Sequence, residues 1–131
     1  MNRVLIDTQA LVWLADDSRI LSQTVLDLLD APTTVRLASV ASIWEMAIKI
    51  GKGLMTLREG DLQQFVDLVQ LNDIELLPVT LADAIDVLKL PRRDDHKDPF
   101  DRLIAAQCLR LDLTLVSIDK AFDAYGVRRV W

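Results

Sequence analysis

Short apolar runs alternate along the chain with longer segments in which apolar residues recur every three or four positions. The run RVLI at residues 3–6 is continuous and predicts a buried strand, whereas Leu11, Leu14 and Ala15 share one face of a helix. The same pairing of a strand with a following helix recurs to the end of the chain. The pattern therefore predicts an α/β layer fold with a mainly parallel central sheet.

Caps and chain breakers place the other elements. Four further segments have the short apolar character of strands; they are residues 35–39, 74–79, 113–119 and 127–131, the last at a sheet edge. Helices are predicted over residues 9–15, after Ser22, over residues 41–50 and 61–71, after Thr80 and from Pro99. The helix after Thr80 is expected to bury one apolar face, which carries Leu81, Ala84, Ile85 and Leu88.

Composition limits the class of protein. With 131 residues, 51% of them hydrophobic, the chain is expected to form a single domain over residues 1–131. No apolar run approaches the ~20 residues that span a bilayer, and the first residues lack a signal pattern, so a soluble cytoplasmic protein is expected. The net charge of −5 argues against binding nucleic acid through a broad basic face but leaves room for an acidic catalytic pocket.

Two predicted strands end in an aspartate. Asp7 follows VLI, and Asp119 follows LVSI. Ligands of parallel α/β sheets bind beyond the carboxyl ends of the strands, which makes both acids candidates for a site. Each also has a purely structural interpretation, because Asp7 can cap the following helix and Asp119 can belong to a turn.

A third acid, Glu45, lies on a predicted helix that is apolar almost all round, with a narrow polar stripe of Ser42, Glu45 and Lys49. Glu45 can simply pair with Lys49 one turn later. In so apolar a setting, however, a carboxylate is costly unless it is paired or binds a cation. Both interpretations stay open.

The stretch HKDPFDRLIAAQ, residues 96–107, places two aspartates at the start of one helix. Asp98 is a typical N-cap, Pro99 is a favoured first residue, and Asp101 follows as the third. Both acids would stabilise the positive end of the helix dipole. Alternatively, Asp98 fixes the helix start while Asp101 points into a shared site.

A shared site gives the four acids a common chemistry. Mg²⁺ and Mn²⁺ prefer oxygen ligands, and clustered carboxylates repel one another unless a cation neutralises them. Such an ion lowers the pKa of a water molecule and stabilises charge on a phosphodiester. The predicted reaction is therefore phosphodiester hydrolysis with Mg²⁺ or Mn²⁺, and the predicted catalytic and metal-binding residues are Asp7, Glu45, Asp101 and Asp119.

Four segments, LIDTQALVWL, ASIWEMAIK, HKDPFDRLIAAQ and LVSIDKAF, resemble the PIN domain in order and over nearly the whole chain, and most closely the VapC-type toxins of bacterial toxin–antitoxin pairs. The resemblance implies a PIN-like three-layer fold, an RNA substrate, Mg²⁺ or Mn²⁺ as cofactor, a homodimer and a cognate antitoxin. It assigns the family's acids to Asp7, Glu45, Asp101 and Asp119. Gln9 and Ser117 depart from the usual histidine and threonine.

Other features add expectations about partners. The hydrophobic content, with Trp13, Trp44 and Trp131, predicts a homodimer. The antitoxin is expected to place a basic side chain across the acidic groove. The charged loop LPRRDDHKDP, residues 90–99, and the start of the next helix carry basic residues that either contact RNA phosphates or are simply solvated; they are Arg92, Arg93, Lys97 and Arg102. His96 in this loop is expected at the surface.

Two rival functions remain. A protein with the same fold can act as a catalytically silent module that binds a partner protein, although the complete set of acids argues against this. A phosphoacceptor signalling domain would need an acidic pair after the first strand and an aspartate after the third. The segment IELLPV ends without an acid, which disfavours this second rival.

Overall fold

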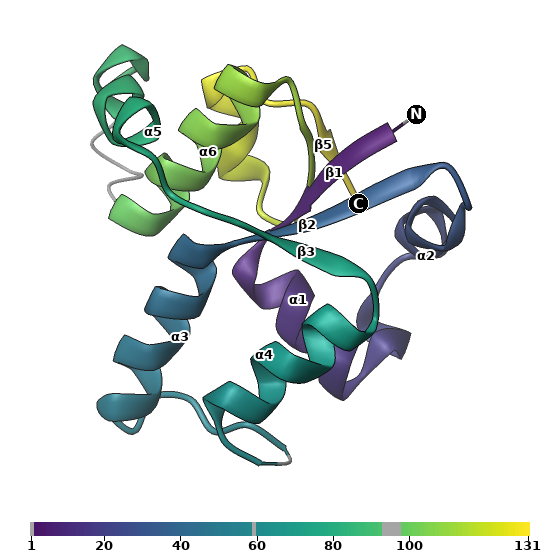
Figure 1. Ribbon diagram of the computed structural model, residues 1–131. Helices are drawn as coiled ribbons and strands as arrows, with labels where there is room; N and C mark the ends of the chain where they lie inside the picture. Colours follow the sequence, from purple (N-terminus) through teal and green to yellow (C-terminus); the bar gives the residue numbers. More distant parts are fainter. Residues whose placement is uncertain (1, 59, 93–97) are drawn as a thin grey trace.

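The computed structural model describes residues 2–58, 60–92 and 98–131. Five strands form one sheet in the order β3-β2-β1-β4-β5, and every neighbouring pair is parallel (Figure 1). The strands are β1 (Asn2–Ile6), β2 (Thr34–Ser39), β3 (Ile74–Leu77), β4 (Thr114–Val116) and β5 (Arg129–Val130). The predicted α/β fold with a parallel central sheet is confirmed.

Helices connect the strands. They are α1 (Thr8–Asp16), α2 (Gln23–Asp30), α3 (Val40–Gly51), α4 (Leu62–Leu71), α5 (Leu81–Asp86) and α6 (Pro99–Leu111). Three 3₁₀ helices are also described: η1 (Ser18–Ile20), η2 (Val87–Lys89) and η3 (Lys120–Tyr125). The sequence pattern missed η1 and η3, which are too short to show a clear period, whereas η2 continues the helix predicted after Thr80. None of the helices in the described ranges has the length and apolar character needed to cross a membrane.

The central strand β1 divides the core into two layers. Val4 and Ile6 pack into a cluster with residues of α1, α2, α3 and α4, whereas Leu5 points to the other side and packs with residues of α6 and η3. Successive residues of a strand face opposite sides of a sheet, so a strand buried on both sides is apolar throughout. Figure 1 shows the resulting three layers, with α1 and α4 on one side of the strands and α6 on the other.

The order of strands reverses beside β1. From β1 the chain moves to β2 and β3 on one side, and then crosses to β4 and β5 on the other. The carboxyl ends of β1 and β4 therefore adjoin at a topological switch point, where connections leave in opposite directions and open a crevice. Asp7 and Asp119 follow these two strands.

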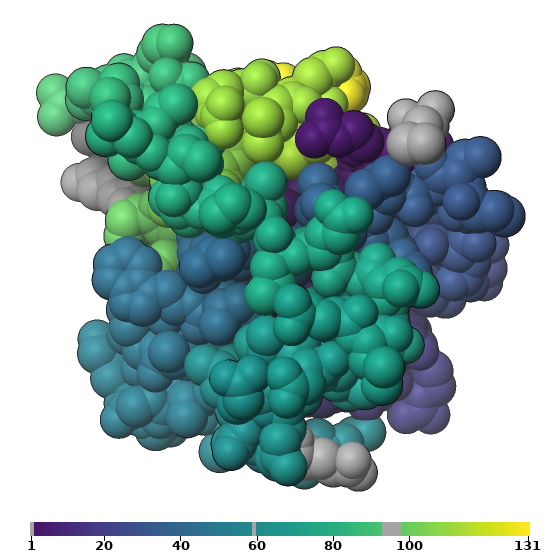
Figure 2. Space-filling view, viewed as in Figure 1, coloured from purple at the N-terminus to yellow at the C-terminus, as the bar shows by residue number. Residues whose placement is uncertain are grey.

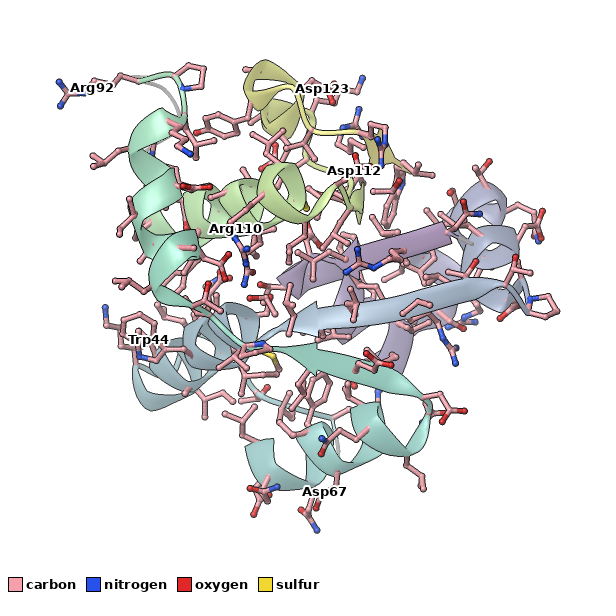
Figure 3. The ribbon with its side chains drawn as sticks, turned by 45° about the horizontal axis from the view of Figure 1, so that its top comes forward. Trp44, Asp67, Arg92, Arg110, Asp112 and Asp123 are labelled. Atoms are coloured by element: carbon pink, nitrogen blue, oxygen red, sulfur yellow. The ribbon has the colours of Figure 1, made fainter. Side chains whose placement is uncertain are left out.

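Helix α5 is oriented opposite to the prediction. Its apolar residues face outward, with Leu88 of the adjoining η2 87% exposed, while Asp83 is completely buried. The Asp83 carboxylate accepts hydrogen bonds from Arg110 Nε at 2.6 Å and Gln107 Nε2 at 3.1 Å. In Figure 3 Arg110 points from α6 toward α5. A charged network thus anchors α5 to α6 by its polar side and leaves the apolar stripe in solvent.

The same network reaches α3. Ser39 caps α3 by accepting from Ala41 N at 3.0 Å, and its hydroxyl donates to Gln107 Oε1 at 2.6 Å. Ser39 and Gln107 are both fully buried. Because α3 carries Glu45 and α6 carries Asp101, this buried chain of hydrogen bonds fixes the two helices relative to each other.

We expect Asp83→Ala to lower the free energy of unfolding by about 3 kcal/mol, because it removes one partner of a buried charged network. Asp86→Ala, which removes an ion pair between the last residue of α5 and the exposed Lys89 of η2, should cost less than about 1 kcal/mol. Urea denaturation of both variants measures the difference. Equal losses would contradict the assigned role of Asp83.

The cost of Asp83→Ala should depend on pH. Burial favours the neutral carboxyl, but hydrogen bonds from Thr80, Arg110 and Gln107 outweigh it and hold the pKa of Asp83 below its usual value. A lowered pKa stabilises the folded state above the unfolded pKa of about 3.9, and this contribution is lost as the pH falls further. The gap between wild type and variant should therefore narrow below about pH 4.

Candidate functional site

A pocket of about 420 Å³ lies at the carboxyl edge of the sheet. All four predicted acids line it, although they come from four separate segments of the chain. Its described lining comprises Asp7, Thr8, Gln9, Glu45, Lys49, Met55, Asp98, Asp101, Ile118 and Asp119. The fold therefore brings the predicted acids together and adds a fifth, Asp98.

Three of these aspartates cap helices that begin at the pocket. Oδ1 of Asp7 accepts from Ala10 N at 2.9 Å, Oδ1 of Asp119 accepts from Ala121 N at 2.9 Å, and Oδ1 of Asp98 accepts from Phe100 N at 2.8 Å. The N-termini of α1, η3 and α6 thus converge on one cavity. The capping predicted for Asp7 and Asp98 is confirmed, and it coexists with a position in the pocket.

Asp7 is the most strongly buried of the three, and its environment disfavours its charge. Burial raises the pKa of Asp7, and the nearby charges of Glu45 and Asp119 raise it further. Hydrogen bonds from Ser117 and the backbone of Ala10 oppose these effects only in part. Burial, more than charge repulsion, therefore makes the ionised form of Asp7 costly at the switch point.

Glu45 faces inward and is only 6% exposed. Its Oε1 accepts from Thr8 Oγ1 at 2.7 Å, and its Oε2 lies 2.8 Å from Lys49 Nζ. The predicted pairing with Lys49 is confirmed. The helix is not buried all round, because Trp44 is 61% exposed, while Glu45 and Lys49 line the pocket.

Asp101 is the third residue of α6 and is partly buried. Its backbone N–H donates to Asp98 Oδ1 at 3.1 Å, so the cap holds Asp101 in place over the cavity. The hydrogen bond with Glu45 raises the pKa of Lys49 despite partial desolvation, and the charges of Glu45, Asp98 and Asp101 add to this. Lys49 therefore lies in the combined field of the α3 and α6 carboxylates.

Two hydroxyl residues support the acids and were missed as contributors to the site. Thr8 orients Glu45 through its hydrogen bond to the carboxylate. Ser117 links Asp7 to Asp119, because its side chain hydrogen-bonds Asp7 while its Oγ accepts from Asp119 N at 3.0 Å. The sequence carried a signal for both, since each lies within two residues of a strand-end acid.

The basic loop residues have other roles where they are described. Arg102 donates to the carbonyls of Pro91 at 3.0 Å and Val87 at 3.4 Å and lies 5.7 Å from the ring centre of Tyr125. Arg102 of α6 therefore contacts both η2 and η3 and stabilises their packing. Arg92 points outward at the edge of the molecule (Figure 3). Arg93, His96 and Lys97 lie outside the described residues.

The donor set suits a hard divalent cation, since carboxylates dominate and one of them, Asp7, is buried among like charges. Within residues 2–58, 60–92 and 98–131, however, no three histidine, cysteine, aspartate or glutamate side chains are arranged to hold a metal ion as they stand. Both oxygens of Glu45 already have partners in Thr8 and Lys49. The chemistry fits a metal, and binding one requires side chains to move.

Comparison with known proteins gives a family and a fold. The model of the PIN domain family matches residues 4–127. The VapBC2 complex of Rickettsia felis bound to a promoter DNA fragment contains a chain with a TM-score of 0.73 and 15% identity, over 98% of this chain and 97% of that one. No curated protein sequence matches the chain significantly.

Two other solved structures share the fold. In DNA-bound VapBC from Salmonella typhimurium the TM-score is 0.67 at 16% identity, with 99% of this chain and 98% of that one covered. In FitAcB from Neisseria gonorrhoeae the TM-score is 0.61 at 19% identity, over 98% and 96% of the two chains. At such identities the likeness establishes the fold alone.

We expect Asp7→Asn to raise the melting temperature of the metal-free protein at neutral pH. Asparagine caps a helix as well as aspartate does, and it carries no charge. Because the pKa of Asp7 is raised in the folded state, its ionisation destabilises wild type as the pH rises through that pKa. The difference in melting temperature between variant and wild type should therefore vanish in acid, where Asp7 is protonated. Thermal melts in chelator at about pH 7 and about pH 3.5 test this. A lower melting temperature at neutral pH would contradict it.

Proposed function

The chain belongs to the PIN domain family, and from this premise we propose that it is an endoribonuclease that hydrolyses RNA phosphodiester bonds with Mg²⁺ or Mn²⁺. One observation carries the proposal. Acids from four segments far apart in sequence line a single pocket at the switch point of a parallel sheet, and they are Asp7, Glu45, Asp101 and Asp119. Helix capping alone gives no reason for Glu45, in the middle of α3, to join them.

In this proposal the four acids would hold the cation, and a bound cation would lower the pKa of a water molecule and stabilise charge on the phosphate oxygens. Thr8 and Ser117 keep the carboxylates of Glu45 and Asp7 oriented, so less reorganisation is needed during reaction. Asp98 and Asp119 are exposed and lie at the rim, where an RNA strand would approach. The net charge of −5 makes RNA binding depend on neutralisation at the pocket.

The rival functions make different demands. A catalytically silent binding module does not need a divalent cation, so absence of Mn²⁺ binding would favour it. A phosphoacceptor domain would need an acid after β3, where the described chain continues instead with Pro78 and Val79. The five carboxylates that line the pocket support a nuclease over a silent binding module and over a phosphoacceptor domain.

Asp101→Asn should reduce Mg²⁺-dependent RNA cleavage by at least roughly 100-fold, because the substitution removes one charge from the proposed cation site. As a helix-terminus acid alone, Asp101 would contribute only about 0.3 to 1 kcal/mol to stability and nothing to cleavage. Cleavage of a labelled RNA with Mg²⁺, with Mn²⁺ and with chelator measures the effect, after circular dichroism confirms folding. Full activity in Asp101→Asn would remove the central residue of the proposal.

Asp98→Asn is the matched comparison for this experiment. Asparagine caps a helix as well as aspartate, and Oδ1 of Asp98 already accepts two backbone N–H groups, so α6 should be unaffected. Because Asp98 also lines the pocket, a loss of cleavage is expected, but a much smaller one than for Asp101→Asn. Equal losses would mean that overall pocket charge matters rather than a specific ligand.

We further propose that the protein is the toxin of a toxin–antitoxin pair in the cytoplasm. The similar chains occur in VapBC complexes and in FitAcB, which supports this role. An inhibiting antitoxin would place a basic side chain among the pocket acids, where a cation is favoured by charge complementarity.

A homodimer is also proposed, and the outward side of α5 provides a surface for it. Leu81, Ile85 and Leu88 recur at helical spacing and are exposed, and Trp44 is exposed on α3. Figure 1 places α3 and α5 on the same side of the molecule, and Figure 2 shows both open to solvent there. In Figure 3 Trp44 of α3 lies on this side too. Trp13 and Trp131 instead pack together, with ring centres 5.8 Å apart. A second copy would cover the stripe symmetrically.

Leu88→Asp should weaken the dimer by roughly tenfold or more, because it places a charge in the proposed apolar contact. Leu71→Asp is the control, since Leu71 is similarly exposed but lies at the end of α4. Sedimentation velocity of wild type and both variants at micromolar concentration reports the association. A monomeric wild type, or equal weakening by both substitutions, would refute the assigned surface.

A further inference from the structure

The acidic pocket contains a cation supplied by the protein itself. Lys49 is the only basic side chain among the described residues that line it. Its Nζ lies 2.8 Å from Oε2 of Glu45, whose side chain is nearly buried. The Lys49 ammonium therefore takes up one oxygen of a carboxylate that the proposed function assigns to a divalent ion.

The environment of Lys49 holds the ammonium in place. Glu45, Asp98 and Asp101 all stabilise its positive charge, so it serves carboxylates of both α3 and α6. Without it, five carboxylates would surround one cavity with no described basic side chain among them. Clustered like charges of this kind destabilise a fold unless a cation offsets them.

The Lys49 side chain also has room to leave. It is 43% exposed, in contrast to the 7% exposure of the Glu45 side chain. Its four-carbon stem is flexible, and an ammonium can move into water at little cost. Glu45 is held from its other side by Thr8 and would stay in position when Lys49 departs.

We propose that Lys49 is a resident counter-ion, which neutralises Glu45 in the metal-free protein and is displaced from it when a divalent cation binds. This inference rests on the proposed metal-dependent function. Lys49 and the metal compete for one carboxylate oxygen and repel each other, so each weakens the binding of the other. Lys49 thereby sets the metal affinity and stabilises the acidic pocket between metal-binding events.

The first test compares the full-length wild type with Lys49→Met and with Lys52→Met, a control at the exposed C-cap of α3 outside the pocket. Titration calorimetry with Mn²⁺ alone, without RNA, should show roughly tenfold tighter binding by Lys49→Met. In chelator, Lys49→Met should melt at a lower temperature, and Mn²⁺ should raise its melting temperature more than that of wild type. Lys52→Met should match wild type in both measurements.

A second measurement uses the wild type and does not depend on how the variant folds. The ¹⁵N resonance of the Lys49 ammonium, assigned with Lys49→Arg, should be protected from solvent exchange in chelator and should lose that protection as Mg²⁺ is added. The Lys52 resonance should not respond.

The outcomes separate this inference from the proposed function. If wild type binds Mn²⁺, but Lys49→Met binds it no more tightly and saturating Mg²⁺ leaves the Lys49 resonance unchanged, the counter-ion role is overturned while the metal site stands. If wild type binds no Mn²⁺, the metal-dependent function fails and this inference fails with it.

Discussion

The parallel pairing of β1 with both β2 and β4 is the constraint on which the pocket depends. Ile6 is in register with Ala38 on one side and with Val116 on the other, so β1 and β4 end at the same level and β2 ends one residue beyond it. In a parallel sheet each following helix begins at that edge, and helix N-termini attract carboxylate caps. Parallel pairing therefore gathers acids in one place before any function is considered.

The candidate site is built largely from aspartates that cap helices. Asp7, Asp98 and Asp119 cap helices in an ordinary way, yet the reversal of strand order makes their caps line a cavity. Glu45 joins them from the middle of α3, where Thr8 and Lys49 hold it. Burial above all, and the charges of Glu45 and Asp119 in addition, raise the pKa of Asp7, so holding this aspartate ionised in the pocket costs stability.

The outer helices follow a different rule. Asp83, Gln107, Arg110 and Ser39 form a polar network between α5, α6 and α3, and its buried members are satisfied by one another. Because α5 is anchored through this network, its apolar residues are left outside. The polar side of a helix faces inward here twice, in α5 and at the Glu45 stripe of α3, and each time hydrogen bonds and ion pairs make that burial possible.

The sequence alone determined the α/β fold, the five strands and the caps at Asp7 and Asp98, because periodicity, capping and strand-end acids are local properties. The resemblance to the PIN domain assigned Glu45 and Asp101 to one site with the strand-end acids. Local pattern could not give the side of α5 that is buried, since hydrophobicity favours the apolar face and takes no account of Arg110, 27 residues beyond Asp83. Local pattern also could not show that Ser117 hydrogen-bonds both Asp7 and the backbone of Asp119. Nor could it show that Asp98 and Asp101, at the start of α6, stabilise the charge of Lys49 together with Glu45 on α3. These features depend on distances between segments remote in sequence, and only the packing of the tertiary structure sets those distances.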